Sequence, residues 1–289
     1  MTRAELLRQG EEVLATHLDQ PRREALWIAQ FLFGCSAASL LAHDDLSVSP
    51  EQAALYQAYL QRRARGEPYA YIRGDAWFYG RRFIVDPRVL VPRPETEVLI
   101  ALALDWCQHY PTADPLTVAD IGTGSGILAL TIASELPSAR VFALDCSVDA
   151  LSVARANAVA LEVSQRVSFC QSNLLASLGD EIRFDLLLAN LPYLPSADIP
   201  QLPDALAFEP RAALDGGSDG LELYRALFGQ LSGHLAREAL VLLEAAPPTL
   251  PGLVAIARQH FPHATLTLER DLSGLERVLK MEIGEGRLA

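Results

Sequence analysis

The sequence has 289 residues, half of them hydrophobic and 21% charged, which is enough to bury a sizeable core in one large domain or two modest ones. Acidic residues outnumber basic residues 36 to 24. The resulting charge of −12 argues against binding nucleic acid by bulk electrostatics, because phosphate binding needs a positive field. All of this charge falls within residues 91–289, whereas residues 1–90 carry 11 arginines and 11 acids.

The four cysteines are far apart and form no CxxC or Cys/His pair, which favours free thiols over a disulfide framework or a metal site. The first residues are acidic and amphipathic, unlike a signal peptide, and no run reaches 18 apolar residues. We therefore expect a cytoplasmic protein that holds no metal and does not bind a membrane.

Residues 1–75 are predicted to form a small helical bundle. Thr2 and Glu5 form a capping box ahead of a first helix. A second helix is expected from Pro21 to about Gly34, and a third from Pro50 to about Gly66. The aromatic and β-branched residues that follow predict a connecting β-hairpin over residues 76–90.

Residues 91–289 alternate apolar runs with helical stretches, after a helix expected over 95–109. This alternation predicts an α/β domain with a doubly wound, mostly parallel seven-stranded sheet covered on both faces. The last two strands have no helix between them and should form an antiparallel hairpin at the sheet edge. The strands are expected at 116–121, 140–145, 166–170, 184–190, 239–244, 264–269 and 275–282, with helices near 126–136, 148–160, 219–235 and 249–260.

The strongest local signal is a glycine-rich turn that follows the first strand of this domain. It consists of Gly122, Thr123, Gly124, Ser125 and Gly126. Glycines let the backbone turn tightly and approach a ligand closely, because no Cβ intervenes. The next strand ends in Asp145, whose carboxylate can accept hydrogen bonds from both ribose hydroxyls of a nucleoside. The third glycine of the dinucleotide pattern G-x-G-x-x-G is missing.

The second signal is Asn190-Leu191-Pro192-Tyr193, directly after an apolar strand. Ligands of open α/β sheets bind beyond the carboxyl ends of the strands, so Asn190 is expected at the same edge as the glycine turn. The Asn190 side-chain oxygen and a backbone carbonyl can accept both hydrogens of a planar NH2 group, with an aromatic ring beside it.

Together, the glycine turn and Asp145 resemble those of class I S-adenosylmethionine-dependent methyltransferases. Three further stretches narrow the resemblance to the glutamine N5-methyltransferases that modify class-1 peptide chain release factors. These stretches are Arg65–Pro68 with Tyr71–Gly74, then Val89–Glu97, and Phe208–Arg211 leading to Gly217–Leu221. The resemblance covers residues 1 to about 280, including the helical domain, to which it gives a role in substrate recognition.

The resemblance implies S-adenosyl-L-methionine as the cofactor and the glutamine of a Gly-Gly-Gln loop on the release factor as the substrate. Gly122–Gly126 would hold the methionine end, Asp145 the ribose, and Leu174 the adenine. Asn190, Leu191, Pro192 and Tyr193 would form the catalytic pocket that grips the glutamine, with Asn190 also at the cofactor. Three positions depart from the family pattern: Leu191 replaces a proline, Ser172–Leu174 replaces Ser-Asp-Trp, and Leu243–Pro247 replaces Glu-Ile-Gly.

Several alternative functions remain open on the sequence. The segment Ala76–Gly80 is typical of the sister enzymes that methylate a glutamine of a large-subunit ribosomal protein, and N-L-P-Y occurs in RNA adenine N6-methyltransferases. The three departures would also fit an inactive cofactor-binding paralogue. Seven arginines between residues 62 and 88, against three acids, indicate either a solvated surface or a docking face for an acidic partner.

Overall fold

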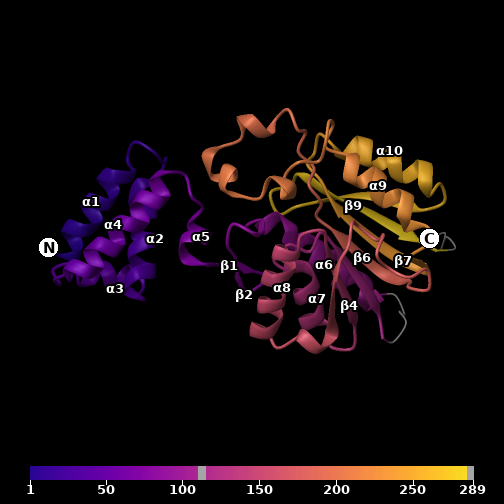
Figure 1. The fold of residues 1–289 in the computed structure, drawn as a ribbon, viewed down its shortest axis with the longest axis horizontal. Helices are drawn as coiled ribbons and strands as arrows, with labels where there is room; N and C mark the ends of the chain where they lie inside the picture. Colours follow the sequence, from indigo (N-terminus) through magenta and orange to yellow (C-terminus); the bar gives the residue numbers. More distant parts are fainter. Residues whose placement is uncertain (110–114, 285–289) are drawn as a thin grey trace. The chain divides into compact units, whose positions relative to one another are not determined.

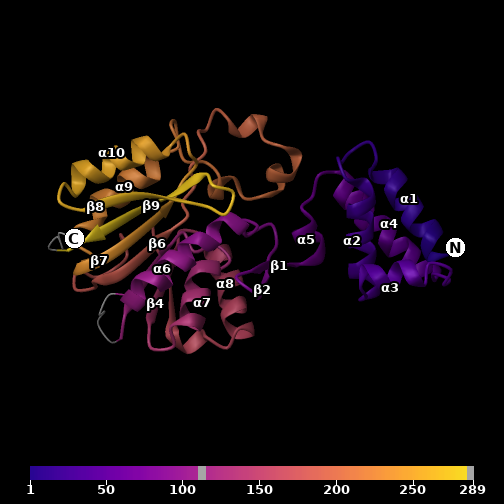
Figure 2. The same cartoon turned by 180° about the vertical axis from the view of Figure 1, so that it is seen from behind.

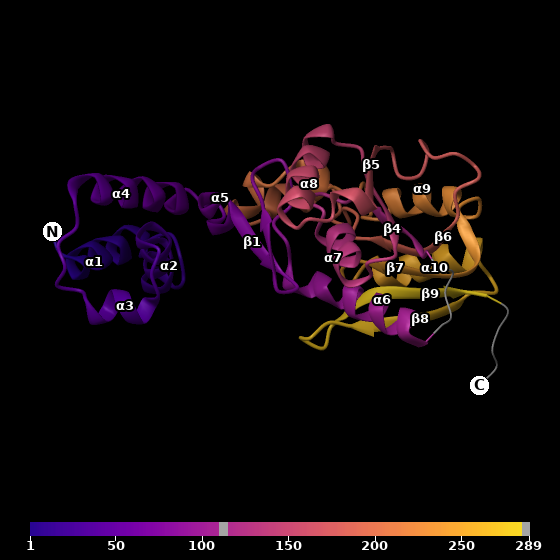
Figure 3. The same ribbon diagram turned by 90° about the horizontal axis from the view of Figure 1, so that it is seen from below.

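The computed structural model describes residues 1–109 and 115–284, which divide into two compact units. The first unit contains residues 1–74 and the short segment Leu202–Phe208. Its three longer helices, α1, α2 and α4, pack on one another around a small apolar core (Figure 3). The helices are α1 (Arg3–Leu14), α2 (Pro21–Phe33), α3 (Ala37–Ala42), α4 (Pro50–Ala64) and α5 (Tyr69–Arg73).

Capping explains where the longer helices of this unit begin. Thr2 and Glu5 form the reciprocal capping box predicted for α1, and Ser49 and Gln52 form a second one at α4. Helix α2 starts at Pro21 and ends at Phe33, and it is capped by Gly34, which adopts the left-handed conformation. The three predicted helices are therefore confirmed, while the short helices α3 and α5 were not predicted.

The second unit is built on a seven-stranded sheet, in the order β5-β4-β3-β6-β7-β9-β8. The first five strands run parallel, and β9 pairs antiparallel with β7 and with the edge strand β8, as predicted. A separate hairpin of β1 and β2 precedes this sheet. The strands are β1 (Asp75–Phe78), β2 (Arg81–Ile84), β3 (Thr117–Ile121), β4 (Arg140–Asp145), β5 (Val167–Gln171), β6 (Phe184–Ala189), β7 (Leu235–Glu244), β8 (Thr265–Arg270) and β9 (Glu276–Ile283).

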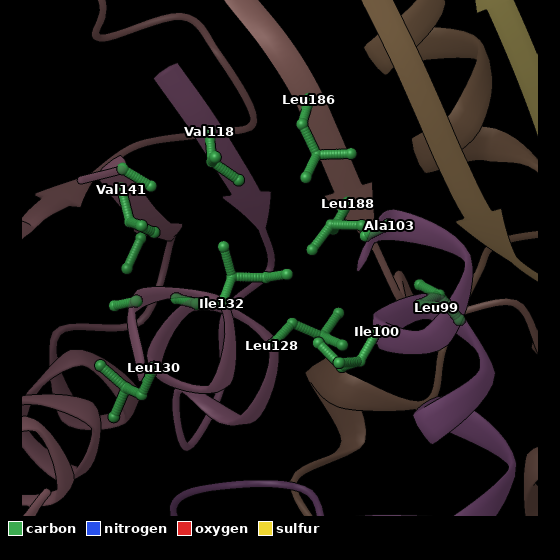
Figure 4. Close-up of a cluster of buried hydrophobic side chains, with 14 of the residues drawn as sticks. Leu99, Ile100, Ala103, Val118, Leu128, Leu130, Ile132, Val141, Leu186 and Leu188 are labelled. Carbon is green, nitrogen blue, oxygen red and sulfur yellow. The ribbon is translucent and has the colours of Figure 1, made fainter. Parts of the chain in front are cut away.

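Helices cover both faces of this sheet, as Figures 1 and 2 show. Helices α6, α7 and α8 cover one face, where Ile100, Leu128 and Ile132 meet strand residues such as Val118 and Leu188 (Figure 4). Helices α9 and α10 cover the other face with a second apolar cluster. These helices are α6 (Glu97–His109), α7 (Ile127–Glu135), α8 (Val148–Ala160), α9 (Glu222–Leu231) and α10 (Leu250–His260), and the 3-10 turns are η1 (Pro94–Thr96), η2 (Ser164–Arg166), η3 (Ile199–Gln201), η4 (Asp204–Phe208) and η5 (Arg211–Ala213).

The sequence positions of these elements agree with the predicted alternation, with differences of up to four residues at the end of α9 and the start of β7. That strand begins at Leu235 rather than near residue 239, and its pairing with β6 shifts register between Phe184 and Leu186. No helix of the described residues is long and apolar enough to cross a membrane.

Strands β3 and β6 lie side by side at the point where the strand order reverses. From β3 the chain proceeds outward to β4 and β5, and then returns to β6 on the other side of β3. Ile121 is paired with Ala189, so the turn after β3 and the loop after β6 leave the sheet next to each other. Such a switch point is where open α/β sheets bind ligands.

Asn157 of α8 fastens two loops to this part of the sheet. The side chain is fully buried, and its Oδ1 accepts a hydrogen bond from the backbone N of Ile84 at 2.6 Å. Its Nδ2 donates to the carbonyls of Ile84 at 3.0 Å and Ser125 at 2.9 Å. One side chain therefore ties the β1–β2 hairpin and the glycine turn to α8.

We expect Asn157→Ala to lower the free energy of unfolding by about 3 kcal/mol, because it removes the partners of the part-buried backbone groups of Ile84 and of the buried Ser125 carbonyl. Chemical denaturation measures this change. The control Val159→Ala, at an exposed position of the same helix, should change stability by less than about 0.5 kcal/mol. Equal unfolding midpoints for Asn157→Ala and wild type would contradict the fastening role.

Candidate active site

The glycine turn continues the hydrogen-bond ladder between β3 and β4 and leads into α7. The backbone N–H groups of Gly122 and Thr123 both donate to the carbonyl of Leu144, at 2.8 and 2.9 Å. Gly122, Gly124 and Gly126 all have positive φ, which explains the glycines at these positions. A Cβ on Gly126 would lie 2.9 Å from Leu130 and 3.3 Å from Ala154, so this glycine also permits close packing of α7 on α8.

A cavity opens above this turn, at the carboxyl ends of β3, β4 and β6. It is lined by Gly122, Thr123, Gly124 and Ser125 of the turn, by Asp145 and by Leu174, whereas Gly126 is not among its lining residues. Asn190, Leu191 and Pro192 line it from the neighbouring strand. Tyr193 is not among its lining residues; it is half-buried, and burial raises the pKa of its phenol to about 12.

Asp120, the last polar residue of β3, lines the floor of this cavity and is fully buried. Its Oδ2 accepts hydrogen bonds from Thr123 Oγ1 at 2.6 Å and from the backbone N of Ala129 at 3.0 Å. Its Oδ1 is buried and has no hydrogen-bond partner among the described residues. Burial raises the pKa of this carboxyl to about 7, since a desolvated charge is costly. A cationic ligand group would satisfy the free oxygen.

Asp145, at the tip of β4, uses its carboxylate to hold the loops around it. Oδ2 accepts from the backbone N of Gly124 and Oδ1 from that of Ser147, both at 2.9 Å. Each oxygen keeps a further lone pair that can accept a hydrogen bond from a ligand hydroxyl. This carboxylate is only half-buried, so it can reach a ligand in the cavity.

Leu174 follows β5 and presents an apolar surface to the cavity. It has a φ of 56°, which is unusual for a leucine, and its side chain is buried. A backbone in this conformation turns the chain over the cavity, where the neighbouring Ser172 Oγ accepts a hydrogen bond from the backbone N of Ser177 at 3.1 Å.

Asn190 is held by a residue that the sequence analysis did not assign to the site. Its Nδ2 donates to Oγ1 of Thr96 at 3.1 Å, and Thr96 is fully buried in the cavity wall. Because the NH2 group is used in this way, Oδ1 is the atom of the carboxamide that can accept a hydrogen bond from a ligand.

Two further loops close the cavity, and they contain the motifs Val89–Glu97 and Phe208–Arg211, to which no role in the site was assigned from the sequence. Buried Glu209 accepts from the backbone N of Val91 at 3.1 Å and from Arg93 at 2.5 Å. This pair joins the loop before α6 to the loop after β6, and Pro92 and Pro210 line the cavity from the two loops. Both motifs are recognisable in the sequence, but only the hydrogen bonds of Glu209 show that the two loops act together.

This arrangement suits a nucleoside ligand that carries a cationic group and lies next to a planar amide. The glycine turn lets a ligand approach the backbone closely, and Asp145 can accept hydrogen bonds from ligand hydroxyls. The Asp120 oxygen without a partner among the described residues suits a cationic group. Within residues 1–109 and 115–284 no cluster of three or more His, Cys, Asp or Glu side chains could hold a metal ion.

A mostly parallel seven-stranded sheet with a cavity at this switch point is the fold of Rossmann-like methyltransferases, and the comparisons with known proteins place the chain in this class. The family described as "PrmC N-terminal domain" matches residues 5–74, and that described as "Methyltransferase small domain" matches residues 106–209. Among solved structures, the catalytic domain of hMettl16 in complex with a MAT2A 3′UTR hairpin superimposes with a TM-score of 0.59 at 15% identity, covering 92% of this chain and 93% of that one. This likeness concerns the fold alone.

Curated relatives define the family more narrowly. A release factor glutamine methyltransferase of Moorella thermoacetica is 37% identical over 263 residues, which cover 90% of each chain. Another of Geobacter sulfurreducens is 39% identical over 271 residues, covering 92% of this chain and 91% of the relative. The chain belongs to the release factor glutamine methyltransferase family.

Proposed function

We propose that this chain transfers a methyl group from S-adenosyl-L-methionine to the side-chain amide nitrogen (N5) of the glutamine in the Gly-Gly-Gln loop of class-1 peptide chain release factors. The observation that carries this proposal is Asn190 in the cavity wall, with its NH2 group held by Thr96 and its oxygen left to accept. Family membership over nine-tenths of the chain supports release factors over the ribosomal-protein, RNA and inactive alternatives.

The residues of the cavity fit the cofactor that this reaction needs. The cofactor supplies an electrophilic methyl group on a sulfonium. Gly122–Gly126 would take its methionine end, with the free Asp120 Oδ1 available to the ammonium group. Asp145 would accept from the ribose hydroxyls, and Leu174 would pack on the adenine.

The chain's contribution to the reaction is alignment of a poor nucleophile. The amide nitrogen of glutamine is unreactive because its lone pair is conjugated with the carbonyl. Asn190 Oδ1 and the Leu191 carbonyl would accept the two amide hydrogens and fix the nitrogen in line with the methyl group. Pro192 keeps Leu191 extended, and Tyr193, which follows it, would shape this pocket. Transfer would form the N–C bond as the S–C bond of the sulfonium breaks, and one amide proton would then be lost to solvent.

We place this activity in the cytoplasm, where release factors act. The four cysteines are free thiols, which suits a reducing compartment. The substrate is a protein, and the acidic balance of the chain does not favour a nucleic-acid partner.

The helical unit, residues 1–75, is proposed to recognise the protein substrate, and the connecting hairpin, residues 76–90, to precede the methyltransferase domain of residues 91–289. The arginine-rich stretch does not offer seven free charges for docking. Five of its arginines pair with Glu67, Glu24, Glu135, Asp75 and Asp86.

A groove of the helical unit provides a better docking surface than these paired arginines. It is lined by Trp27, Gln30, Phe31, Tyr69 and Arg73. The Trp27 and Tyr69 rings stack with centroids 5.9 Å apart, and Trp27 is 36% exposed. Exposed aromatic side chains beside arginine are typical of protein-interaction hot spots.

We expect Trp27→Ala to raise KM for an intact release factor about tenfold while leaving KM for a short Gly-Gly-Gln peptide unchanged, because only the intact protein would reach the groove. Initial-rate kinetics with both substrates measure this. The control Leu41→Ala, at an exposed position outside the groove, should affect neither substrate. An equal effect of Trp27→Ala on both substrates would rule out docking at this groove.

Asp145→Ala is expected to weaken cofactor binding at least tenfold. It removes the acceptor for the ribose hydroxyls, and hydrogen bonds to a charged group contribute about 1.5–3 kcal/mol each. Calorimetric titration of S-adenosylmethionine measures the change, with Asp149→Ala, an exposed acid in the first turn of α8, as the control. Unchanged affinity in a folded Asp145→Ala protein would reject this ribose site.

Asn190→Ala should slow single-turnover methylation of a class-1 release factor by about 10²–10³, because one preorganised acceptor for the amide is lost. Cofactor affinity should change much less, since the proposed ribose and methionine contacts are made by other residues. Mass spectrometry follows the methyl group, and a release factor with glutamate in place of the target glutamine is the negative control. Wild-type rates for Asn190→Ala would refute amide clamping, and methylation of the glutamate control would place the methyl group elsewhere.

A further inference from the structure

Behind Asn190 lies a buried carboxylate to which the proposed reaction assigns no role. Glu244 is the last residue of β7 and is 1% exposed. Its side chain is hydrogen-bonded to both Thr96 and Asn190, and Thr96 in turn accepts from Asn190 Nδ2 at 3.1 Å. The three side chains come from β7, η1 and the loop after β6 and form one polar cluster; Thr96 and Asn190 line the cavity, whereas Glu244 is not among its lining residues.

The surroundings of this carboxylate are fixed by groups on several elements. The charges that act on it are those of Glu95 in η1 and Arg277 in β9, and the phenols of Tyr193 and Tyr224 lie close enough to interact with it. The Tyr224 hydroxyl donates to the backbone carbonyl of Glu244, which holds the strand end in place independently of the carboxylate.

Burial raises the pKa of Glu244 to about 7, although the hydrogen bonds from Thr96 and Asn190 and the charge of Arg277 oppose this rise. Its second oxygen, Oε2, is buried with no hydrogen-bond partner among the described residues. The group therefore changes its charge close to neutral pH while staying in contact with Asn190.

We propose that Glu244 and Thr96 are positioning residues that lock the orientation of the Asn190 carboxamide, so that its oxygen and not its NH2 group faces the substrate amide. This inference rests on the proposed function, because it explains how the amide acceptor is set.

The hydrogen-bonding capacity of each group explains the lock. An ionised carboxylate can only accept, so it draws the Thr96 hydroxyl proton and the Asn190 NH2 group toward itself. A carboxamide turned by 180° would place Oδ1 against that carboxylate, where no proton lies between the two acceptors. A protonated carboxyl can donate to Oδ1 and removes this discrimination. The competent orientation thus depends on the ionised form of Glu244.

The decisive measurement is the pH profile of single-turnover methylation of a release factor at saturating cofactor. For wild type the rate should rise up to about tenfold between pH 6 and 8, which is the change in ionised fraction of a group with a pKa of about 7. Glu244→Gln is neutral and can donate or accept, so its rate should lie about tenfold below wild type at pH 8 and should not rise with pH. The control Glu238→Gln, at an exposed position of the same strand, should keep the wild-type profile.

The other carboxyl with a pKa of about 7 in this cavity, Asp120, is present in all of these proteins, so any pH effect of Asp120 is shared by them. The difference between the Glu244→Gln and wild-type profiles isolates Glu244. Superimposable profiles and rates for the two proteins would overturn the proposal.

A second set of variants tests Thr96 and the route through Asn190. Thr96→Val removes the hydroxyl at nearly constant volume and should slow methylation about tenfold, whereas Thr96→Ser retains it and should restore most of the rate. If both residues act through Asn190, adding Glu244→Gln to Asn190→Ala should produce no further loss, so the double variant should match Asn190→Ala alone. A further tenfold loss would mean that Glu244 acts independently and would contradict the inference.

The outcomes separate this inference from the function on which it rests. If wild type fails to methylate the release factor at every pH, the proposed function and the inference both fall. If wild type methylates and the Glu244→Gln profile superimposes on that of wild type, only the inference falls.

Discussion

The parallel pairing of β3 with β6 is the constraint on which the site depends. Ile121 and Ala189 are register partners, so the chain leaves the sheet at Gly122 and at Asn190 from adjacent positions. A slip of one residue would turn every side chain of a strand to the other face, and the buried apolar residues on both faces oppose such a slip. The two covered faces therefore fix the distance between the glycine turn and Asn190.

The same burial makes the polar groups of the site costly to the stability of the fold, so their presence is informative about function. Asp120 and Glu244 are both buried carboxyls with one unpartnered oxygen and a raised pKa. Because both pKa values are raised, folding favours their protonated forms, and their contribution to stability decreases as the pH rises from about 4 to 7. A chain selected for stability alone would replace such groups with apolar residues. Asp120 lines the cavity and Glu244 interacts with Thr96 and Asn190 of its wall, which indicates that both carboxyls serve the site.

Local sequence signals predicted most of the fold and pointed to many of the residues that line the cavity. Capping boxes and prolines fixed the starts of α1, α2 and α4, and apolar runs located all seven strands of the main sheet, because these features act over a few residues. The short helix α3 has no comparable periodic pattern. Thr96 lies 94 residues before Asn190 in the sequence, so nothing local relates the two. Glu209 and Val91 are likewise joined only by tertiary packing.

Leu191 shows how a departure from the family motif is accommodated. A proline at this position has no N–H, whereas a leucine in the same buried place brings a donor that needs a partner. The Tyr224 hydroxyl accepts this N–H while donating its own proton to the carbonyl of Glu244. The leucine side chain also packs against the glycine turn, since a Cβ on Gly122 would lie 3.0 Å from its Cδ2. The leucine therefore links the β6 loop to both the glycine turn and, through Tyr224, the end of β7.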